Sequence, residues 1–365
     1  MPTKMHAVMK TEAGPGLAWV ETDIPTVGPD DVLVQVRATS ICGTDLHIRR
    51  WDTWASGRVH PPLIVGHEMC GEVVAIGERV STVAVGDFVS AESHIVCGIC
   101  DQCSTGNAHI CRNTKILGVD TDGVFAEYAC IPAANAWKNP LDMPWELAAL
   151  QENFGNAVHT VMAADTRARR VLVTGCGPVG LMAIAVVCAL GARVVIATDI
   201  SEYRLDLARR LGADLALNPS RDDVQAAVLD RTAGGGVDVL LEFSGAAPAI
   251  RQGLHALRDG GEAALLGIPH HPIELDWAND VVFKGITLRG IVGRRLWQTW
   301  HTVRDLLEGG LVDLSPVVTH RFALADFDQA MDTMASGKSG KVVMFPQGVP
   351  AAVETGAAAM TVLGR

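Results

Sequence analysis

The segment VLVTGCGPVG, residues 171–180, is the part of the chain that decides the fold. A short β-branched run ends in Gly175, Gly177 and Gly180, which have the spacing G-x-G-x-x-G, and a helical stretch follows. In this setting the first glycine permits a tight turn, the second lets a pyrophosphate approach the backbone, and the third lets helix and strand pack closely. The segment therefore predicts a βαβ unit that binds a dinucleotide at a helix N-terminus.

Strands and helical stretches alternate from this segment onward. From about Glu146 onward the text reads VLVTG, PVGLMAIAVVCAL, RVVIATD and SEYRLDLARRLGA, followed by strand candidates VDVLLEFSG, GEAALLGI and ITLRGIVG. Such alternation is typical of βαβ units on a parallel sheet. We expect an α/β, doubly wound parallel sheet of about six strands, forming a cofactor-binding domain over residues 154–297.

The sequence before this domain has a different pattern. Residues 1–153 contain short β-branched segments interrupted by glycine and proline, such as DVLVQVRA, GEVVAIGERV and VGDFVSAE, which predict a mainly β domain. We expect residues 298–346, with a helix over Trp300–Leu307, to return and complete that first domain. The weakly patterned residues 347–365 are predicted to form a loose C-terminal tail.

Composition narrows the class of protein. The chain has 365 residues, 48% of them hydrophobic, so it can bury a large core in two domains of ordinary size. A net charge of -11 argues against phosphate-based binding of nucleic acid. The longest apolar stretch, Val179–Ala192, is too short to span a bilayer, so we expect no membrane segment. Nine cysteines, an odd number, and no apolar N-terminal stretch favour a reducing cytoplasm.

An acidic residue, Asp199, ends the next predicted strand roughly 20 residues after the glycines, where a carboxylate can accept hydrogen bonds from the adenosine ribose. A 2'-phosphate would meet like charge there, so NAD is predicted over NADP. Arg204 lies nearby and could stack on adenine or pair with a phosphate. The alternative is that Asp199 only caps the following helix.

Four cysteines in CGICDQCSTGNAHIC have the spacing C-x2-C-x2-C-x7-C. Four thiolates on one loop are typical of a closed, tetrahedral structural zinc site with no open position for a substrate. The alternatives are two disulfides or cysteines that are close by chance. The predicted ligands of this site are Cys97, Cys100, Cys103 and Cys111.

A second metal site is predicted upstream. Cys42 in SICGTDLHI and the pair His67 and Glu68 in VGHEMCGEV lie in loops between predicted strands. Three protein ligands with an open fourth position let zinc lower the pKa of a substrate hydroxyl. Glu152 in LQENFGNAVHT could reach this metal directly, through water, or as a proton acceptor. Taken singly, each could instead be a buried cysteine, a core histidine or a solvated glutamate.

These motifs together resemble a known family. Cys42-Gly-Thr-Asp, Gly66-His67-Glu68 followed by Gly71, the four-cysteine loop and the glycine fingerprint are similar to those of zinc-dependent medium-chain alcohol dehydrogenases. The resemblance covers about residues 5–345 and implies a Rossmann domain plus a mainly β, GroES-like catalytic domain with zinc sites. The strings CGTDLHIRRWDTWA, AESHIVCGICDQC, ICRNTKILGVD, FGNAVHT and SGKSGKVV are most similar to the L-threonine 3-dehydrogenases within that family.

The resemblance implies roles for individual residues. Cys42, His67 and Glu68 would bind catalytic zinc, with Glu152 close to the metal and important for proton transfer. Thr44 and His47 would form a proton relay, and His94 would lie in the substrate pocket. A turn-forming hydroxyl and a surface histidine are the alternatives for the relay pair. The implied NAD contacts are Val179, Asp199, Arg204, Leu266, Gly267, Ile268, Ile291 and Val292.

The implied reaction is oxidation of the C3 hydroxyl of L-threonine by NAD, giving 2-amino-3-oxobutanoate. The resemblance also implies a homotetramer and a pathway link to a 2-amino-3-oxobutanoate CoA ligase. One departure is Cys70, which occupies a position where related sequences often carry an aromatic residue. The alternatives are a zinc-dependent polyol or diol dehydrogenase, such as one acting on sorbitol or 2,3-butanediol, and a catalytically silent NAD-binding protein.

Overall fold

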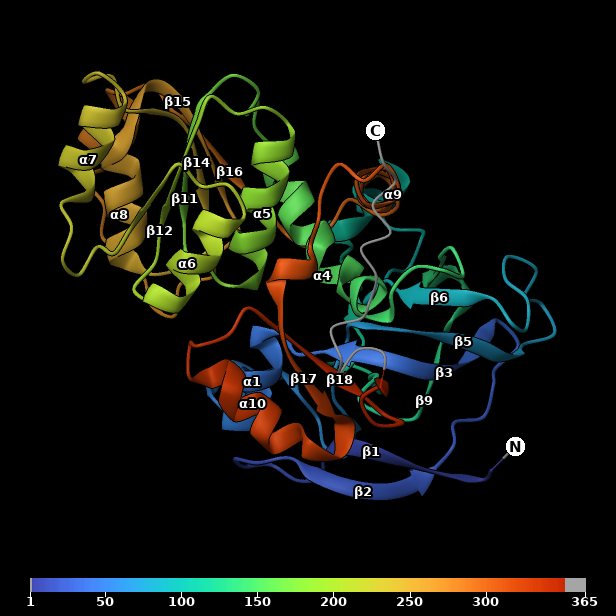
Figure 1. Ribbon diagram of the computed structural model, residues 1–365. Helices are drawn as coiled ribbons and strands as arrows, with labels where there is room; N and C mark the ends of the chain where they lie inside the picture. Colours follow the sequence, from blue (N-terminus) through green and yellow to red (C-terminus); the bar gives the residue numbers. More distant parts are fainter. Residues whose placement is uncertain (1, 352–365) are drawn as a thin grey trace.

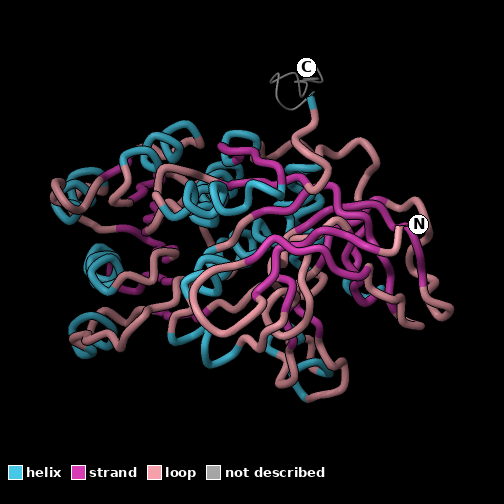
Figure 2. The backbone as a smooth tube through the Cα atoms, turned by 90° about the horizontal axis from the view of Figure 1, so that it is seen from below, coloured by secondary structure: helices cyan, strands magenta, loops and turns pink. Residues whose placement is uncertain are grey.

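The computed structural model describes residues 2–351 and contains two sheet-based halves joined by one long helix (Figure 1). The parallel sheet with its helices occupies the upper left of that view, and the β-rich half occupies the lower right. Seen from below, most helices gather at one end and most strands at the other (Figure 2). Of the predicted tail, residues 352–365 lie outside the described part of the chain.

The first half, which carries the cysteine motifs, is mainly β. A seven-stranded sheet has the order β10-β6-β5-β3-β18-β17, with β9 also paired to β3, beside sheets β2-β1-β4 and β7-β8. Its strands are β1 (Lys4–Lys10), β2 (Ala18–Asp23), β3 (Asp31–Ser40), β4 (Leu63–Ile64), β5 (Met69–Ile76), β6 (Phe88–Ala91), β7 (His94–Ile95), β8 (Lys115–Ile116), β9 (Tyr128–Pro132) and β10 (Ala136–Lys138). Its short helices are α1 (Gly43–Arg50), α2 (Thr53–Arg58) and α3 (Asp101–Ser104).

The second half contains a six-stranded, wholly parallel sheet in the order β13-β12-β11-β14-β15-β16. This is the 3-2-1-4-5-6 order of a doubly wound dinucleotide fold, as the alternating pattern predicted. The strands are β11 (Arg170–Thr174), β12 (Val194–Thr198), β13 (Leu215–Leu217), β14 (Val237–Glu242), β15 (Leu257–Leu265) and β16 (Thr287–Gly290). The helices are α5 (Pro178–Ala189), α6 (Glu202–Arg210), α7 (Val224–Arg231) and α8 (Ala247–Ala256).

Both faces of this parallel sheet are covered by helices. Helices α5 and α6 pack on one face, and α7 and α8 pack on the other. The central strands are therefore buried on both sides, which explains why they read as continuous apolar runs such as VLV and VVIAT. Among the helices of residues 2–351, none has both the length and the apolar character needed to cross a bilayer.

The C-terminal segment returns to the first half. After α9 (Gln298–Glu308), strands β17 (Val318–Ala323) and β18 (Lys341–Phe345) run parallel to each other, with α10 (Phe327–Ala335) between them in the chain. β18 then pairs antiparallel with β3, so residues far apart in sequence share one sheet. The predicted helix Trp300–Leu307 lies within α9.

Helix α4 (Trp145–Met162) crosses the predicted domain boundary at residue 153 without a break. It packs on β3, β5 and β6 of the first half and on α5 and α9, and it is buried along most of its length. Because helix α4 contacts both halves, it can place side chains in the space between them (Figure 1).

Candidate active site and metal centres

The three fingerprint glycines have three different surroundings. Gly175 has a φ of +89°, a backbone conformation that favours glycine. Gly177 is the N-cap of α5, and a Cβ built there meets nothing within 4 Å. A Cβ on Gly180 would lie 1.9 Å from the carbonyl oxygen of Gly175. The geometry therefore matches a tight turn, an open surface above the helix N-terminus, and close packing of helix and loop.

Asp199 lies at the carboxyl end of β12 beside this loop. Its Oδ2 accepts a hydrogen bond from the backbone N of Cys176 at 2.7 Å, and its Oδ1 accepts one from Ser201 N at 2.8 Å. The carboxylate thus both ties down the fingerprint loop and orders the start of α6. Arg204 donates from Nε to the carbonyl of Ser339 at 3.2 Å, which attaches α6 to the C-terminal segment.

The other predicted cofactor residues gather at the same edge of the parallel sheet. Val179 lies in the first turn of α5, the run from Leu266 to Ile268 follows β15, and Ile291 with Val292 follows β16. Ile268 is 84% exposed and Val292 is 52% exposed. This edge, at the carboxyl ends of the strands, is where open α/β sheets bind ligands.

The four loop cysteines come together as a compact group. The Sγ atoms of Cys100 and Cys103 are 3.5 Å apart, those of Cys100 and Cys111 are 3.8 Å apart, and those of Cys111 and Cys97 are 3.5 Å apart. Four sulfurs bonded tetrahedrally to zinc at about 2.3 Å lie roughly 3.8 Å from one another. A disulfide needs about 2.05 Å, and all nine cysteines are free. The residues fit a zinc ion.

Backbone amides support thiolate character in this loop. The N–H groups of Cys97 and Asn113 donate to the Sγ of Cys111 at 3.4 and 3.3 Å. Amides of Ile99 and Cys100 lower the pKa of the Cys97 thiol to about 6. Thiolates are the form of cysteine that binds metal.

The second predicted group also assembles. Ligand atoms of Cys42, His67 and Glu68 all lie within 4.8 Å of one another. Cys42 is held because it precedes α1, where Asp45 Oδ2 accepts a hydrogen bond from its backbone N at 2.8 Å. His67 follows Gly66, whose φ of +87° turns the chain.

The chemistry of this group fits a cation. Glu68 Oε1 is buried and finds no hydrogen-bond partner among residues 2–351. Buried polar atoms without partners are costly unless another group, such as a metal ion, satisfies the site. Asp45 Oδ1 lies 3.6 Å from His67 Nδ1, and burial raises the pKa of Asp45 to about 6. A soft thiolate, an imidazole and a carboxylate are ligands that zinc accepts.

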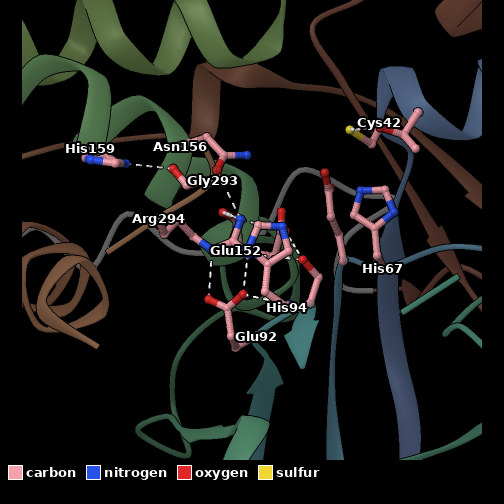
Figure 3. A network of polar contacts seen from close by, with 12 residues as sticks. Cys42, His67, Glu92, His94, Glu152, Asn156, His159, Gly293 and Arg294 are labelled. Carbon is pink, nitrogen blue, oxygen red and sulfur yellow. Dashed lines mark hydrogen bonds and ion pairs between the residues drawn. The ribbon is translucent and has the colours of Figure 1, made fainter. Parts of the chain in front are cut away.

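Glu152 lies near this group but is already engaged. Its Oε1 accepts a hydrogen bond from Ser93 Oγ at 2.5 Å and lies 2.6 Å from Arg294 Nη1. Its Oε2 is buried and has no hydrogen-bond partner in the described chain. In Figure 3 Glu152 lies between Arg294 and His67. One oxygen of Glu152 is therefore unpaired within the described chain, although Glu152 is not among the three residues whose ligand atoms lie within 4.8 Å of one another.

His94 lies beside a different carboxylate, that of Glu92. Its backbone N donates to Glu92 Oε1 at 2.8 Å, and a Cβ on Gly293 would approach its ring to 2.4 Å. Burial, helped by the charge of Arg294, lowers the pKa of His94 to about 4, so the ring is neutral near pH 7. A neutral imidazole can accept or donate one hydrogen bond to a substrate.

The predicted relay residues share one face of α1. Thr44 Oγ1 lies 3.9 Å from Cys42 Sγ, and His47 Nδ1 lies 2.5 Å from Asp52 Oδ2. The ring of His47 is also 5.5 Å from the ring of His270, which comes from the loop after β15 in the other half. The structure thus places a hydroxyl beside Cys42 and a partly exposed imidazole next to a residue of the other half.

Several residues of the site escaped the sequence analysis. Lys341 of β18 is buried with its Nζ 2.5 Å from Glu68 Oε2, and Glu92 and Arg294 form a buried ion pair. Their partners are distant in the chain, so local spacing carries no signal for them. Asp45 could have been found, because an acidic residue three positions after an N-cap is the capping-box pattern. Cys70, the departure from the family, is buried, and its Sγ contacts the carbonyl of Trp145 at 3.1 Å.

Comparisons with known proteins agree with this geometry. The alcohol dehydrogenase GroES-like domain family matches residues 28–141, and the zinc-binding dehydrogenase family matches residues 178–309. L-threonine 3-dehydrogenase from Symbiobacterium thermophilum is 55% identical, covering 95% of this chain and 99% of its own. The enzyme of the same name from Pyrococcus horikoshii is 52% identical, covering 94% and 99%.

Solved structures share the whole fold. A putative zinc-binding dehydrogenase from Sinorhizobium meliloti bound to NADP has a TM-score of 0.87 at 29% identity, covering 94% of this chain and all of its own. The 2R,3R-butanediol dehydrogenase from Bacillus subtilis has a TM-score of 0.85 at 29% identity, covering 94% and 99%. The chain belongs to the L-threonine 3-dehydrogenase family of zinc-dependent alcohol dehydrogenases.

Proposed function

We propose that the protein oxidises the C3 hydroxyl of L-threonine with NAD, giving 2-amino-3-oxobutanoate, NADH and a proton. The observation that carries the proposal is the group Cys42, His67 and Glu68, assembled in a chain about half identical to the curated L-threonine 3-dehydrogenases. When bound, zinc at this group would lower the pKa of the hydroxyl, and NAD would accept the hydride.

The protein's own side chains would handle the proton. Thr44 is close enough to the metal group to accept a hydrogen bond from the substrate hydroxyl. His47, oriented by Asp52, would receive the proton through the cofactor ribose and release it to solvent. Glu152 would offer Oε2 as a proton acceptor beside the metal group, and neutral His94 would contact the substrate.

The cofactor would lie along the carboxyl edge of the parallel sheet. Its pyrophosphate would meet the N-terminus of α5 above Gly177, where no side chain blocks the approach. Asp199 would accept hydrogen bonds from the adenosine ribose in exchange for its present bonds to backbone amides. The same carboxylate disfavours a 2'-phosphate, which supports NAD as the preferred cofactor.

The two halves of the chain would have separate roles. We assign residues 1–153 with 298–346 to the catalytic half, supported by the pairing of β18 with β3, and residues 154–297 to the NAD-binding half. A structural zinc would occupy the four-cysteine group. Free, unpaired cysteines are consistent with a cytoplasmic protein.

We infer a homotetramer on the basis of the family. Two features support self-association. The edge strand β16 pairs with β15 alone among the described residues, and exposed apolar side chains, Trp277, Val282 and Phe283, precede it. A 2-amino-3-oxobutanoate CoA ligase would use the product. Light scattering of the purified protein tests the tetramer directly.

The decisive experiment compares substrates. NADH formation by zinc-loaded protein would be measured with L-threonine, D-threonine, L-serine, 2,3-butanediol and sorbitol, with NAD and NADP in parallel. Preference for L-threonine with NAD supports the proposal, and preference for a diol or polyol supports the second candidate, to which the butanediol dehydrogenase likeness points. NADH binding without turnover of any alcohol would support a silent cofactor-binding protein.

Removing the ammonium group from the substrate separates the first two candidates further. An enzyme that reads this charge should oxidise 3-hydroxybutanoate, which is L-threonine without its ammonium group, far more slowly than L-threonine, because a site built for a polar group rejects an analogue lacking it by about 10⁴-fold or more. A diol dehydrogenase should show no such loss.

A further inference from the structure

A buried guanidinium links the two halves of the protein beside Glu152. Arg294 is 1% exposed and follows β16, whereas its partners Glu92 and Glu152, 0% and 4% exposed, follow β6 and lie in α4 (Figure 3). Arg294 Nε donates to Glu92 Oε2 at 2.9 Å, and Nη2 donates to Glu92 Oε1 and to Ser93 Oγ. Nη1 donates to Asn156 Oδ1 at 3.0 Å and to the carbonyl of Glu152 at 3.3 Å, and it lies 2.6 Å from Glu152 Oε1.

This arrangement uses all five N–H groups of the guanidinium, which has a rigid planar fork of donors. Glu92 is equally saturated, since it also accepts hydrogen bonds from Trp300 Nε1 at 2.6 Å and from the backbone N of His94 at 2.8 Å. Burial is the largest single influence on Glu92 and opposes its ionisation, but the charge and hydrogen bonds of Arg294, together with the hydrogen bond from Trp300, hold the pKa of Glu92 below its usual range. Both members of the pair are therefore fixed and charged.

The segment that carries Arg294 is fixed as well. His159 Nδ1–H donates to the carbonyl of Gly293 at 2.9 Å, and the side chain of Arg294 passes so close to α4 that a Cβ on Gly155 would meet its Cδ at 2.4 Å (Figure 3). Arg294 cannot shift along α4 without breaking these contacts.

Because two carboxylates share the guanidinium of Arg294, only one oxygen of Glu152 is paired with it. Glu92 takes the bidentate Nε and Nη2 edge, so Glu152 receives only Nη1, at its Oε1. Its Oε2 is left without a partner within the described chain. If Glu92 lost its charge, Glu152 would be the only carboxylate in contact with the guanidinium, and bidentate pairing would occupy both of its oxygens.

We propose that Glu92 is a positioning residue that acts through Arg294 to keep Oε2 of Glu152 free at the Cys42, His67 and Glu68 group. This inference rests on the proposed function, because it assigns Glu152 a part in alcohol oxidation. Glu92 itself touches neither substrate nor cofactor in this account. Its effect on turnover should therefore exist only while Glu152 is a carboxylate.

A double-mutant cycle tests this dependence. Glu92→Gln keeps the shape of the side chain and removes its charge, and it is compared in the wild-type and Glu152→Gln backgrounds. Rates of alcohol oxidation, NADH affinity, zinc content and melting temperature are measured for each protein. Glu262→Gln, which breaks the half-exposed pair between Glu262 of β15 and Arg289 of the edge strand β16, is the matched control.

The expected result is strongly non-additive. Glu92→Gln should lower kcat by about tenfold or more in the wild-type background, equivalent to about 1.4 kcal/mol. It should change the residual rate of Glu152→Gln by less than about twofold, with NADH affinity and zinc content retained in both. An equal loss of kcat in the two backgrounds would mean a general structural role and would overturn the proposal. An unchanged kcat in the wild-type background would overturn it too.

A gentler variant covers the case in which Glu92→Gln does not fold. Trp300→Phe keeps every charge and removes the indole hydrogen bond to Glu92, together with part of the buried ring that packs on Trp137 and Trp297. It should lower kcat by a few-fold in the wild-type background and leave kcat unchanged in the Glu152→Gln background. An equal loss of kcat in both backgrounds, or no loss in the wild-type background, would overturn the proposal. If the wild-type enzyme prefers a diol to L-threonine, the substrate assignment fails, and the same cycle run on that diol still tests Glu92.

Discussion

Two glycines of the fingerprint, Gly177 and Gly180, should fail in different ways when each is replaced by alanine. A Cβ on Gly180 would lie 1.9 Å from the carbonyl oxygen of Gly175, and real Cβ atoms essentially never come within 3.0 Å of such an atom. Helix α5 and the loop would have to separate by about 1.1 Å, and overpacking of this kind costs about 1–3 kcal/mol. At Gly177 the space around a new Cβ is empty.

Gly180→Ala should therefore lower the melting temperature of the cofactor-free protein by about 2–12 °C, at about 2–4 °C per kcal/mol for a domain of this size. Gly177→Ala should cost less than about 1 kcal/mol, the usual effect of alanine at an N-cap. It should nevertheless weaken NADH binding by about tenfold or more, or about 1.4 kcal/mol, because the methyl group occupies the space of the pyrophosphate.

The assay combines thermal unfolding without cofactor and titration of NADH by fluorescence on the same preparations. Equal destabilisation by the two substitutions would refute the distinction between a packing glycine and a cofactor glycine. Unchanged NADH affinity in Gly177→Ala would show that the pyrophosphate does not approach α5 at this point.

Three further predictions address the cofactor, the fold and the zinc loop. Asp199→Gly should reduce the preference for NAD over NADP, measured as the ratio of steady-state rates with the two cofactors. An unchanged ratio would mean that the carboxylate only organises the loop. Asp238→Asn should destabilise the protein by about 1–3 kcal/mol at pH 7, because Arg170 and Arg258 lose a charged partner. Hydrogen bonds from Arg170 hold the pKa of Asp238 below its usual range. The difference in melting temperature between the wild type and Asp238→Asn should therefore become smaller as the pH falls below about 4. A difference that does not depend on pH would contradict a stabilising ion pair. Cys100→Ser should remove one zinc per chain and lower thermal stability, as metal analysis and calorimetry can show; two retained zinc ions would rule out this loop as a metal site.

Features encoded by short spacings could be predicted from the sequence. The parallel sheet and its fingerprint follow from alternating apolar runs and three glycines, and the cysteine group follows from gaps of two and seven residues. Cys42, His67 and Glu68 were predicted as a set because each residue type is a zinc ligand, and the structure brings their ligand atoms together.

Pairings between distant segments could not be predicted. Arg294 and Glu92 are separated by 202 residues, and Lys341 reaches Glu68 only because β18 inserts beside β3. Hydrophobic periodicity reports which face of an element is buried and not which element covers it. For the same reason, the change of pattern near Glu146 predicted the start of a second domain but did not predict that α4 packs against both halves.

The most direct test of the account is the zinc content, NADH affinity and L-threonine turnover of Cys42→Ser beside the wild-type protein. The wild-type enzyme should hold two zinc ions per chain and form NADH from L-threonine. Cys42→Ser should hold one zinc ion, bind NADH with an affinity within about twofold, and show no turnover, because Cys42 belongs to the catalytic group and not to the fingerprint. A variant that keeps both zinc ions and oxidises L-threonine would contradict the assignment of the catalytic metal.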